Sequence, residues 1–257
     1  LRSIGLRGIE MKNTHLLGED LCPIHCIQLN QMGPVIYCKK CVLDKPFKSL
    51  EPERVLEKHQ TQNNSASYKK LGIPKRHISS TFDNYNLEFI IQKEVCDQLV
   101  EYAMNFDKNE CKNLVLLGRE GTGKTHLACA ILKLVVQKGL RVRYINSFDL
   151  SSFFVENWKN NNFYERNEVE NFKSYDLLIL DEYGLYDQTE HYKNYVDKVL
   201  YKRYDSEKPT IIISNLIKDQ FISKIGFRLW SRLNEDGLSL FELTWPDYRM
   251  SSLTKSK

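Results

Sequence analysis

Short apolar runs alternate with helical and polar stretches along the last two thirds of the chain. Residues 113–117 (NLVLL), 177–180 (LLIL) and 211–213 (III) predict buried strands, and LSLFELTW at 238–245 predicts a final one. A helical pattern from Thr125 to about Val136 follows the first run. Strands separated by helices are typical of an α/β domain.

A polar stretch divides the chain into two predicted units. The 257 residues, 42% of them hydrophobic, suffice for the core of one α/β domain and a smaller appendage. Residues 61–67 (TQNNSAS), which follow a charged segment, have the composition of a linker. We therefore place the boundary near residue 65, with a small module over 1–65 and the α/β domain over 66–257.

Charge and hydropathy limit the classes of partner that this chain can have. Its net charge of +4 sits at the front, where residues 1–70 hold 11 Lys and Arg against 7 Asp and Glu. This excess favours an acidic partner for the N-terminal part, although a solvated surface also explains so few charges. No apolar run approaches the roughly 20 residues of a membrane span, and the first residues lack a signal peptide's apolar core. We expect a soluble, cytoplasmic protein with no membrane contact. The chain begins with a leucine, and Met11 follows closely, as it would if residues 1–10 were an upstream extension of the reading frame. We therefore assign no function to these ten residues.

Four of the seven cysteines cluster within LCPIHCIQLNQMGPVIYCKKC, residues 21–41. The pairs Cys22-x2-His25 and Cys38-x2-Cys41 flank a strand-like segment with a central turn, which is the arrangement of a zinc ribbon. Cys26 offers an alternative to His25 as a ligand, and we favour His25 because a two-residue spacing is the commoner one. Unrelated buried thiols are the other interpretation. Bound Zn²⁺ would supply most of the folding free energy of so small a module.

A glycine-rich loop joins the first predicted strand to the helix after it. Gly118, Gly121, Gly123, Lys124 and Thr125 match the phosphate-loop pattern G-x4-G-K-[ST] without a gap. The glycines let backbone N–H groups surround a phosphate, and the N-terminus of the helix favours an anion. We expect ATP here, with Lys124 at the β- and γ-phosphates and Thr125 holding Mg²⁺.

Polar residues end the next two apolar runs. Asp181 and Glu182 follow LLIL, at the strand end where a parallel sheet presents ligand-facing groups. We expect Asp181 to organise Mg²⁺ and Glu182 to polarise an attacking water, which favours hydrolysis over phosphoryl transfer to a metabolite. If the third strand lies beside the first, Asn215 at its end helps to position the same water. An asparagine that merely ends a strand is the alternative.

Two arginines occupy one face of a predicted helix near the C-terminus. Arg228 and Arg232 are one turn apart, so both project in the same direction. An arginine that reaches the nucleotide of a neighbouring subunit makes hydrolysis depend on assembly, as an arginine finger does. Two solvated arginines on a basic helix face are the alternative.

The order of these motifs resembles that of the DnaC-type replicative helicase loaders of the AAA+ ATPases, including their phage and prophage relatives. The chain contains GREGTGKTHLA, LLILDEYG, IIISNL, FRLWSRL and TWPDYR, preceded by LGIPKRHISSTFDNY at 71–85, so the similarity extends from Leu71 to Arg249. The resemblance implies an α/β fold: a P-loop AAA+ core with a five-stranded parallel sheet, helices on both faces and no helical lid. It also implies a loader that associates with itself, binds a hexameric replicative helicase and helps to place it on single-stranded DNA.

The resemblance further implies roles for individual residues. WSRL is similar to a box shared with DnaA-type initiators, which selects Arg232 as the finger and leaves Arg228 as a second basic group. The leading segment, residues 71–85, resembles the part that closes over adenine, which nominates Ile73, Pro74 and Phe82 for packing on the ring. The zinc-type front departs from the best-known bacterial loader, and the choice of helicase therefore stays open.

An aromatic and asparagine-rich stretch, residues 145–167, lies between the phosphate loop and the acidic pair. In loaders and initiators this region includes helices that face single-stranded DNA. Phe153, Phe154 and Trp158, with Lys159, could stack on bases and contact phosphate, or the three aromatic residues could belong to a helix core.

Three other functions compete with a helicase loader. An IstB-type transposition ATPase shares the fold and nearly all motifs, but would bind duplex DNA and a transposase. A zinc-ribbon scaffold that does not hydrolyse ATP is a second, and the complete loop and Asp-Glu motifs speak against it. A P-loop kinase for a small metabolite is the third, and the sequence carries no signature of its substrate pocket.

Overall fold

The computed structural model describes residues 30–32, 35–37, 68–107, 112–157, 165–185, 190–235 and 237–250. The chain divides into two compact units, Leu1–Phe47 and Lys48–Lys257. In the first, β1 (Asn30–Met32) and β2 (Val35–Tyr37) pair as an antiparallel hairpin, which confirms the predicted strand-like segment. The predicted linker at 61–67 and the boundary near residue 65 lie outside the described residues.

The second unit is built on a five-stranded sheet in which all pairs are parallel. Its spatial order is β4-β5-β6-β3-β7, so the first strand of this unit, β3, lies between the last two. The strands are β3 (Leu114–Gly118), β4 (Val142–Asn146), β5 (Leu177–Asp181), β6 (Thr210–Ser214) and β7 (Ser239–Leu243). The predicted parallel sheet is therefore confirmed, and β6, the strand that Asn215 follows, does lie beside the phosphate-loop strand β3.

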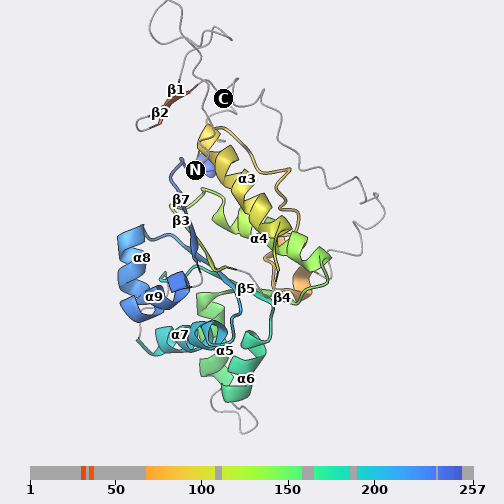
Figure 1. Cartoon of the computed structure of the whole chain (residues 1–257), viewed down its shortest axis with the longest axis vertical. Coiled ribbons are helices and arrows are strands. Elements are labelled where there is room, and N and C mark those ends of the chain that lie inside the picture. The colour runs from red at the N-terminus through yellow and green to blue at the C-terminus, as the bar shows by residue number, and fades with distance from the viewer. Residues whose placement is uncertain are drawn as a thin grey trace, which may run out of the picture. The chain divides into compact units, whose positions relative to one another are not determined.

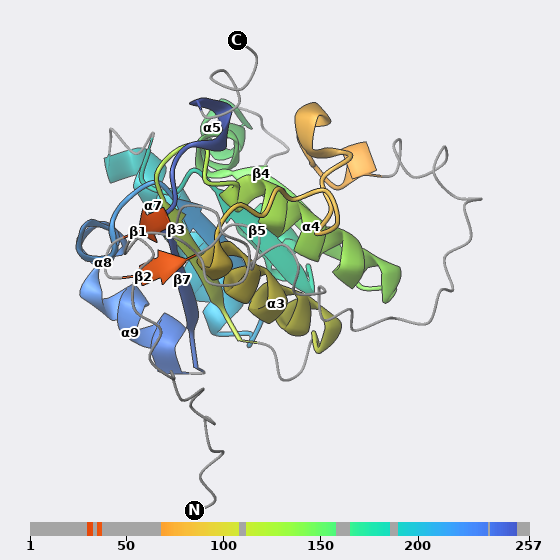
Figure 2. The same ribbon diagram turned by 90° about the horizontal axis from the view of Figure 1, so that it is seen from above.

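Helices cover both faces of this sheet (Figures 1 and 2). Two of them, α3 (Ile90–Met104) and α4 (Lys124–Gln137), pack together on one face. The other face carries α5 (Ser147–Asn157), α6 (Glu165–Lys173), α7 (Glu190–Tyr204), α8 (Lys218–Ile225) and α9 (Phe227–Glu235). A short 3-10 helix, η1 (Lys75–His77), lies in the leading segment. No helical lid follows β7 within the described residues, which end at Met250.

Alternate side chains of the central strands serve the two faces. In β3, Val115 and Leu117 belong to the same buried cluster as Leu150 of α5 and Leu229 of α9. Their neighbours Leu114 and Leu116 are equally buried and point to the opposite face, because successive strand residues alternate. Strands buried on both faces read as continuous apolar runs, which is why the three runs in the sequence were recognisable.

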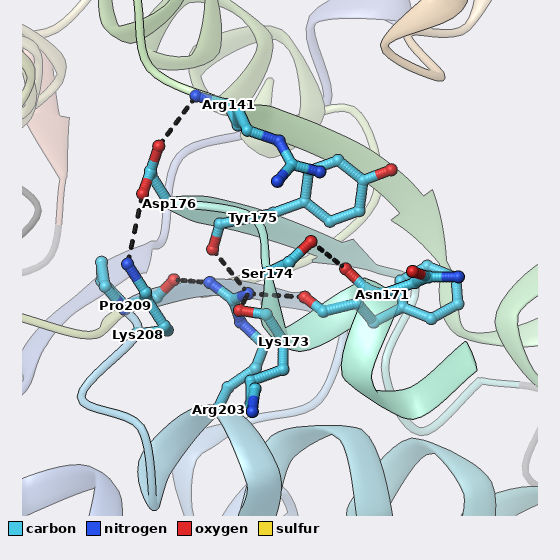
Figure 3. A network of polar contacts seen from close by, with 10 residues as sticks. Arg141, Asn171, Lys173, Ser174, Tyr175, Asp176, Arg203, Lys208 and Pro209 are labelled. Atoms are coloured by element: carbon cyan, nitrogen blue, oxygen red, sulfur yellow. Dashed lines mark hydrogen bonds and ion pairs between the residues drawn. The ribbon is translucent and has the colours of Figure 1, made fainter. Parts of the chain in front are cut away.

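A buried arginine fastens the amino ends of β5 and β6 (Figure 3). Arg203, at the end of α7, is fully buried and donates to the carbonyls of Phe172 at 2.7 Å, Tyr175 at 2.9 Å and Pro209 at 2.6 Å. Its Nε also donates to Thr210 Oγ1 at 2.9 Å. This network joins the end of α6 to the starts of two strands, so it stabilises the sheet at the amino ends of these strands.

None of the described helices is long and apolar enough to cross a membrane.

Candidate nucleotide-binding site

A cavity of about 300 Å³ lies at the carboxyl ends of the central strands. Seven of its lining residues were nominated from the sequence, namely Gly121, Gly123, Lys124, Thr125, Asp181, Glu182 and Asn215. Six further lining residues were not predicted from the sequence: Arg76, His77, Glu120, His126, Tyr248 and Arg249. The topology therefore brings the loop, the acidic pair and the asparagine from three strands into one place.

The loop between β3 and α4 needs its glycines. Gly121 has φ +74° and Gly123 has φ +87°, values that side-chain-bearing residues rarely adopt. A Cβ at Gly121 would lie 1.6 Å from Asp247 Oδ1, and one at Gly123 would lie 2.4 Å from Cε2 of Tyr85. Gly118 ends β3, where a Cβ would lie 2.4 Å from the carbonyl oxygen of Leu243. The loop thus keeps a shape that leaves its backbone free to approach a phosphate.

Two segments distant in sequence hold this loop in place. The Thr122 carbonyl accepts hydrogen bonds from the Tyr85 hydroxyl at 2.8 Å and from Trp245 Nε1 at 2.8 Å. The backbone N–H of Tyr248 donates to the Gly121 carbonyl at 3.1 Å. The TWPDYR segment, known so far only as a motif, therefore packs on the phosphate loop and brings Arg249 to the cavity.

Lys124 begins α4 and is only 6% exposed. Its ammonium donates to the carbonyls of Gly118 and Arg119, each at 2.7 Å. Burial lowers the pKa of Lys124 to about 8, against the opposing influence of Asp181 and Glu120. The side chain therefore supplies a cation at neutral pH at the point where the helix N-terminus also favours an anion.

Asp181 ends β5 and is 3% exposed, yet each of its oxygens has a donor. Oδ2 accepts from Thr125 Oγ1 at 2.8 Å and from the Tyr144 hydroxyl at 2.6 Å. Oδ1 accepts from the backbone N–H of Glu182 at 2.7 Å. The carboxylate is thereby held beside the threonine that the phosphate-loop pattern assigns to Mg²⁺.

Glu182 adopts a left-handed backbone conformation, with φ +57°. Such a conformation is costly for a residue with a side chain and persists where the surroundings enforce it. Here Ser147 Oγ donates to the Glu182 carbonyl at 2.9 Å, while the Glu182 N–H is fixed on Asp181. Burial and the neighbouring Asp181 raise the pKa of the Glu182 carboxyl, which makes it a better proton acceptor.

Asn215 follows β6 and faces the phosphate loop. Its Nδ2 donates to Oε1 of Glu120 at 3.0 Å. The preceding Ser214 is fully buried and donates from Oγ to the Tyr183 carbonyl at 2.7 Å. These contacts couple the end of β6 both to the loop and to the residue after Glu182.

The leading segment borders the cavity through polar residues. Arg76 and His77 line it, whereas Ile73 at 4% exposure and Phe82 at 8% are buried in the core and do not appear in its wall. Pro74 precedes η1 and is likewise not among the lining residues. The expectation that these three residues pack on adenine therefore has no support from the geometry of this cavity.

Histidines from two segments meet at this side of the cavity. His126, the residue after Thr125, donates from Nε2 to the Thr81 carbonyl at 2.8 Å. Burial and the nearby Arg76 lower the pKa of His77 to about 4, and burial also lowers that of His126. Both rings are therefore neutral at pH 7. The only sequence signal for His126 was its place inside the loop motif GKTHLA.

The two arginines of α9 do not line their own chain's cavity. Arg232 packs over the rings of Tyr201 and Tyr204, with its guanidinium carbon 4.9 and 5.0 Å from the ring centres. Its Nη1 also lies 3.9 Å from Asp205 Oδ1. Arg228 is exposed. Within one chain, neither residue is therefore among the groups that border the space beside the phosphate loop.

The aromatic residues of α5 belong mainly to the core. Phe154 is fully buried and stacks on Tyr195 with ring centres 5.0 Å apart, which excludes it from stacking on DNA bases. Phe153 is partly buried and packs edge-on against Phe154 and Phe172. The core interpretation thus holds for these two residues. Trp158 and Lys159 lie outside the described residues.

The zinc prediction also lies outside the described residues, because these exclude every proposed ligand: Cys22, His25, Cys38, Cys41 and the alternative Cys26. Among the side chains that the structure does describe, no three or more His, Cys, Asp or Glu residues form a group that could hold a metal ion.

The donor set of the cavity fits a nucleoside triphosphate with Mg²⁺. The glycine loop and the start of α4 present backbone N–H groups, and Lys124, Arg76 and Arg249 add cations around the same space. The Thr125 hydroxyl and the Asp181 carboxylate, in contact at 2.8 Å, are hard oxygen ligands of the kind that Mg²⁺ prefers.

Comparisons with known proteins agree with this geometry. A family model described as IstB-like ATP binding protein matches residues 49–228. The replicative helicase loader DnaC of Buchnera aphidicola subsp. Baizongia pistaciae is 29% identical over 201 residues, which are 78% of this chain and 81% of that protein. DnaC of Escherichia coli K12 is 27% identical over 183 residues, 71% of this chain and 74% of that protein. A crystal structure of the DnaC helicase loader has the same fold, with a TM-score of 0.59 at 24% identity over 67% of this chain and 100% of that one.

Proposed function

Because the chain belongs to the family of IstB-like ATP binding proteins, we propose that it is an ATP-hydrolysing loader of a hexameric replicative DNA helicase. In this role it binds the helicase and helps to place it on single-stranded DNA during replication initiation. The observation that carries the proposal is the cavity that joins the phosphate loop to the acidic pair, in a chain whose curated relatives are named replicative helicase loaders. Those relatives align with more than two thirds of its length.

The residues of the cavity divide the work of hydrolysis. Bound ATP with Mg²⁺ supplies a phosphoanhydride bond that water can cleave. The loop N–H groups and Lys124 bind the phosphates, while Thr125 and Asp181 hold the metal. Glu182 accepts the proton of the attacking water, and Asn215 orients that water from the end of β6. A positioned general base contributes about 10² to 10⁴-fold to such a rate.

Assembly completes the site in this proposal. The self-association places Arg232 of one subunit at the cavity of the next, with Arg228 as a second basic group beside it. Neither arginine lines its own cavity, and Arg232 packs on Tyr201, which supports a role in a neighbour's site rather than in their own. Hydrolysis would then be slow for an isolated subunit and would reset a contact between subunits, so that ATP acts as a switch.

The test is to mix the protein with candidate hexameric helicases and ATP and to look for a stable complex by size-exclusion chromatography. We expect the wild type to form an ATP-dependent complex, and Arg232→Ala to bind nucleotide but not to assemble. Lys202→Ala is the matched control, since it removes an exposed cation from α7 on the same side of the sheet. Assembly of Arg232→Ala at wild-type levels removes that residue from the proposed role.

The family description itself favours one second candidate, an IstB-type accessory ATPase of transposition. A pull-down that retains a transposase and ignores replicative helicases would establish it in place of the loader. Undetectable hydrolysis with helicase and single-stranded DNA present would instead favour a scaffold, and phosphorylation of nucleosides would indicate a kinase.

For the N-terminal module, we propose that Cys22, His25, Cys38 and Cys41 bind one Zn²⁺ and that this module contacts the helicase. Metal analysis of the purified protein should find zinc that is lost in Cys38→Ser.

A further inference from the structure

We propose that Tyr144 is a positioning residue for the Mg²⁺-binding carboxylate of Asp181. This inference rests on the proposed function, because it concerns the same ATP site. The phosphate-loop pattern and the acidic pair do not include Tyr144, which lies in β4, a strand that carries none of the motifs.

The sheet explains how a residue of β4 reaches the site. Strands β4 and β5 are parallel neighbours, with Tyr144 opposite Ile179 and Asn146 opposite Asp181. Tyr144 and Asp181 therefore project from the same face, two residues apart along the strands. Neighbouring strands lie about 4.8 Å apart and two residues along a parallel strand span about 6.6 Å, so a long aromatic side chain can join the pair. The hydroxyl accordingly meets Asp181 Oδ2 at 2.6 Å.

The backbone of Tyr144 is fixed by the leading segment. Its N–H donates to the Leu71 carbonyl at 2.8 Å. A Cβ on Gly72 would lie 2.1 Å from the Tyr144 carbonyl oxygen, so the leading segment and β4 are in close contact at that point. Tyr144 is itself only 6% exposed. The phenol has little freedom to leave Asp181, and its hydroxyl acts as a fixed donor.

The division of donors on Asp181 indicates what this fixed donor does. The Thr125 hydroxyl also donates to Oδ2, at 2.8 Å, which leaves its own lone pairs for a metal. If the Thr125 hydroxyl turned from Asp181 to a bound metal, the hydrogen bonds from Tyr144 and from the Glu182 N–H would still hold the carboxylate in one orientation. Without the Tyr144 hydroxyl, Oδ2 of a carboxylate that is 3% exposed would depend on Thr125 alone. Mg²⁺ demands near-ideal ligand geometry, so looser ligands should bind it less well.

The test measures Mg²⁺-dependent binding of a fluorescent ATP analogue to the full chain, by titrating Mg²⁺ at fixed nucleotide and by titrating nucleotide in EDTA. We expect Tyr144→Phe to raise the Mg²⁺ concentration for half-maximal binding by about tenfold, as loss of a hydrogen bond to a charged group suggests. Affinity in EDTA should change by less than about twofold, because the loop and Lys124 remain intact. Tyr102→Phe is the control, since it removes a phenolic donor to the Lys112 carbonyl outside the ATP cavity.

The outcomes separate this inference from the proposed function. A folded Tyr144→Phe with a wild-type Mg²⁺ response overturns the positioning role and leaves the ATP site untouched. An equal loss of affinity with and without Mg²⁺ also overturns it, because that result marks Tyr144 as merely structural. Failure of the wild type to bind the analogue at all contradicts the proposed function instead. Should the phenylalanine variant not fold, Tyr144→Met removes the same donor with a more adaptable side chain and gives the same comparison.

Discussion

Lys133 links α4 to the leading segment, and its replacement by methionine should disturb both stability and nucleotide binding. Lys133 is 6% exposed, and its ammonium donates to the carbonyls of Ile78 at 2.6 Å and Ser80 at 2.5 Å. Hydrogen bonds to a charged group contribute about 1.5–3 kcal/mol each, but methionine also removes the cost of burying the charge. We therefore expect a net loss of about 2–3 kcal/mol in the free energy of unfolding. Because the same segment carries Arg76 and His77 to the cavity, ATP binding should weaken about tenfold, which corresponds to roughly 1.4 kcal/mol.

The matched control is Lys138→Met, at the C-cap residue that ends the same helix. Lys138 also donates to two carbonyls, those of Met104 at 2.5 Å and Phe106 at 3.2 Å, but it is exposed and binds the end of α3 instead. It should cost less than about 1 kcal/mol and leave nucleotide affinity unchanged. Urea unfolding and titration with a fluorescent ATP analogue measure the two quantities. Equal effects of the two substitutions, or unaltered ATP binding by Lys133→Met, would refute the view that this lysine holds the wall of the site.

Three other substitutions test separate parts of the structure. Arg203→Met leaves the carbonyls of the buried network without their donor and should lower the free energy of unfolding, measured by urea denaturation, by about 3–5 kcal/mol. ATP affinity should stay within about twofold, because the cavity lies at the other end of the strands. Gly121→Ala places a Cβ 1.6 Å from Asp247 Oδ1 and should weaken ATP binding about tenfold or more, whereas Gly139→Ala has a similar φ of +78° with nothing within 4 Å and should leave binding unchanged; the contrast fails if both behave alike. For His77, whose pKa is lowered from 6.5 to about 4, the folded state binds fewer protons than the unfolded state between these values. His77 therefore does not lower the free energy of unfolding above pH 6.5, but lowers it progressively as the pH falls from 6.5 toward 4. His77→Gln should flatten this decline, and an unchanged slope would exclude His77 as its source.

The sequence predicted the central sheet because its strands are buried on both faces and are bounded by polar or glycine residues. The apolar runs before Gly118, Asp181 and Asn215 could be predicted as strands from the local sequence, without knowledge of distant contacts. Strand β4, with Arg143 between Val142 and Tyr144, lacks such a run, and only the general likeness to a five-stranded fold implied its existence. The pattern of a strand that is less buried at every second position resembles that of an exposed segment.

Several residues of the site could not be predicted, since their roles depend on contacts between distant segments. Tyr144 meets Asp181 across 37 positions of sequence, and Lys133 meets Ser80 across 53. Neither tyrosine nor lysine at those positions carries a local signal. For Phe154 the sequence offered two interpretations, and the packing of α5 on α7 decided between them, because a ring stacked on Tyr195 in the core cannot also face DNA.

The position of Arg232 follows from the sheet order rather than from its motif. Its helix, α9, packs on α7 and α8, on the face of the sheet opposite α4, whose N-terminus holds the phosphate loop. A guanidinium packed over Tyr201 and Tyr204 on that face would have to pass around the end of the sheet to meet Lys124 of its own chain. A second copy of the chain has no such constraint, because its cavity opens at the carboxyl ends of its strands. That copy can therefore bring its cavity to Arg232 of the first chain from outside. If Arg232 contributes to hydrolysis, the rate per subunit must therefore rise with protein concentration. A mixture of Lys124→Ala and Arg232→Ala chains, each inactive alone, should then recover part of the activity, because one partner supplies an intact loop and the other an intact arginine. Absence of any recovery, with both variants folded, would place the arginine outside the chemistry.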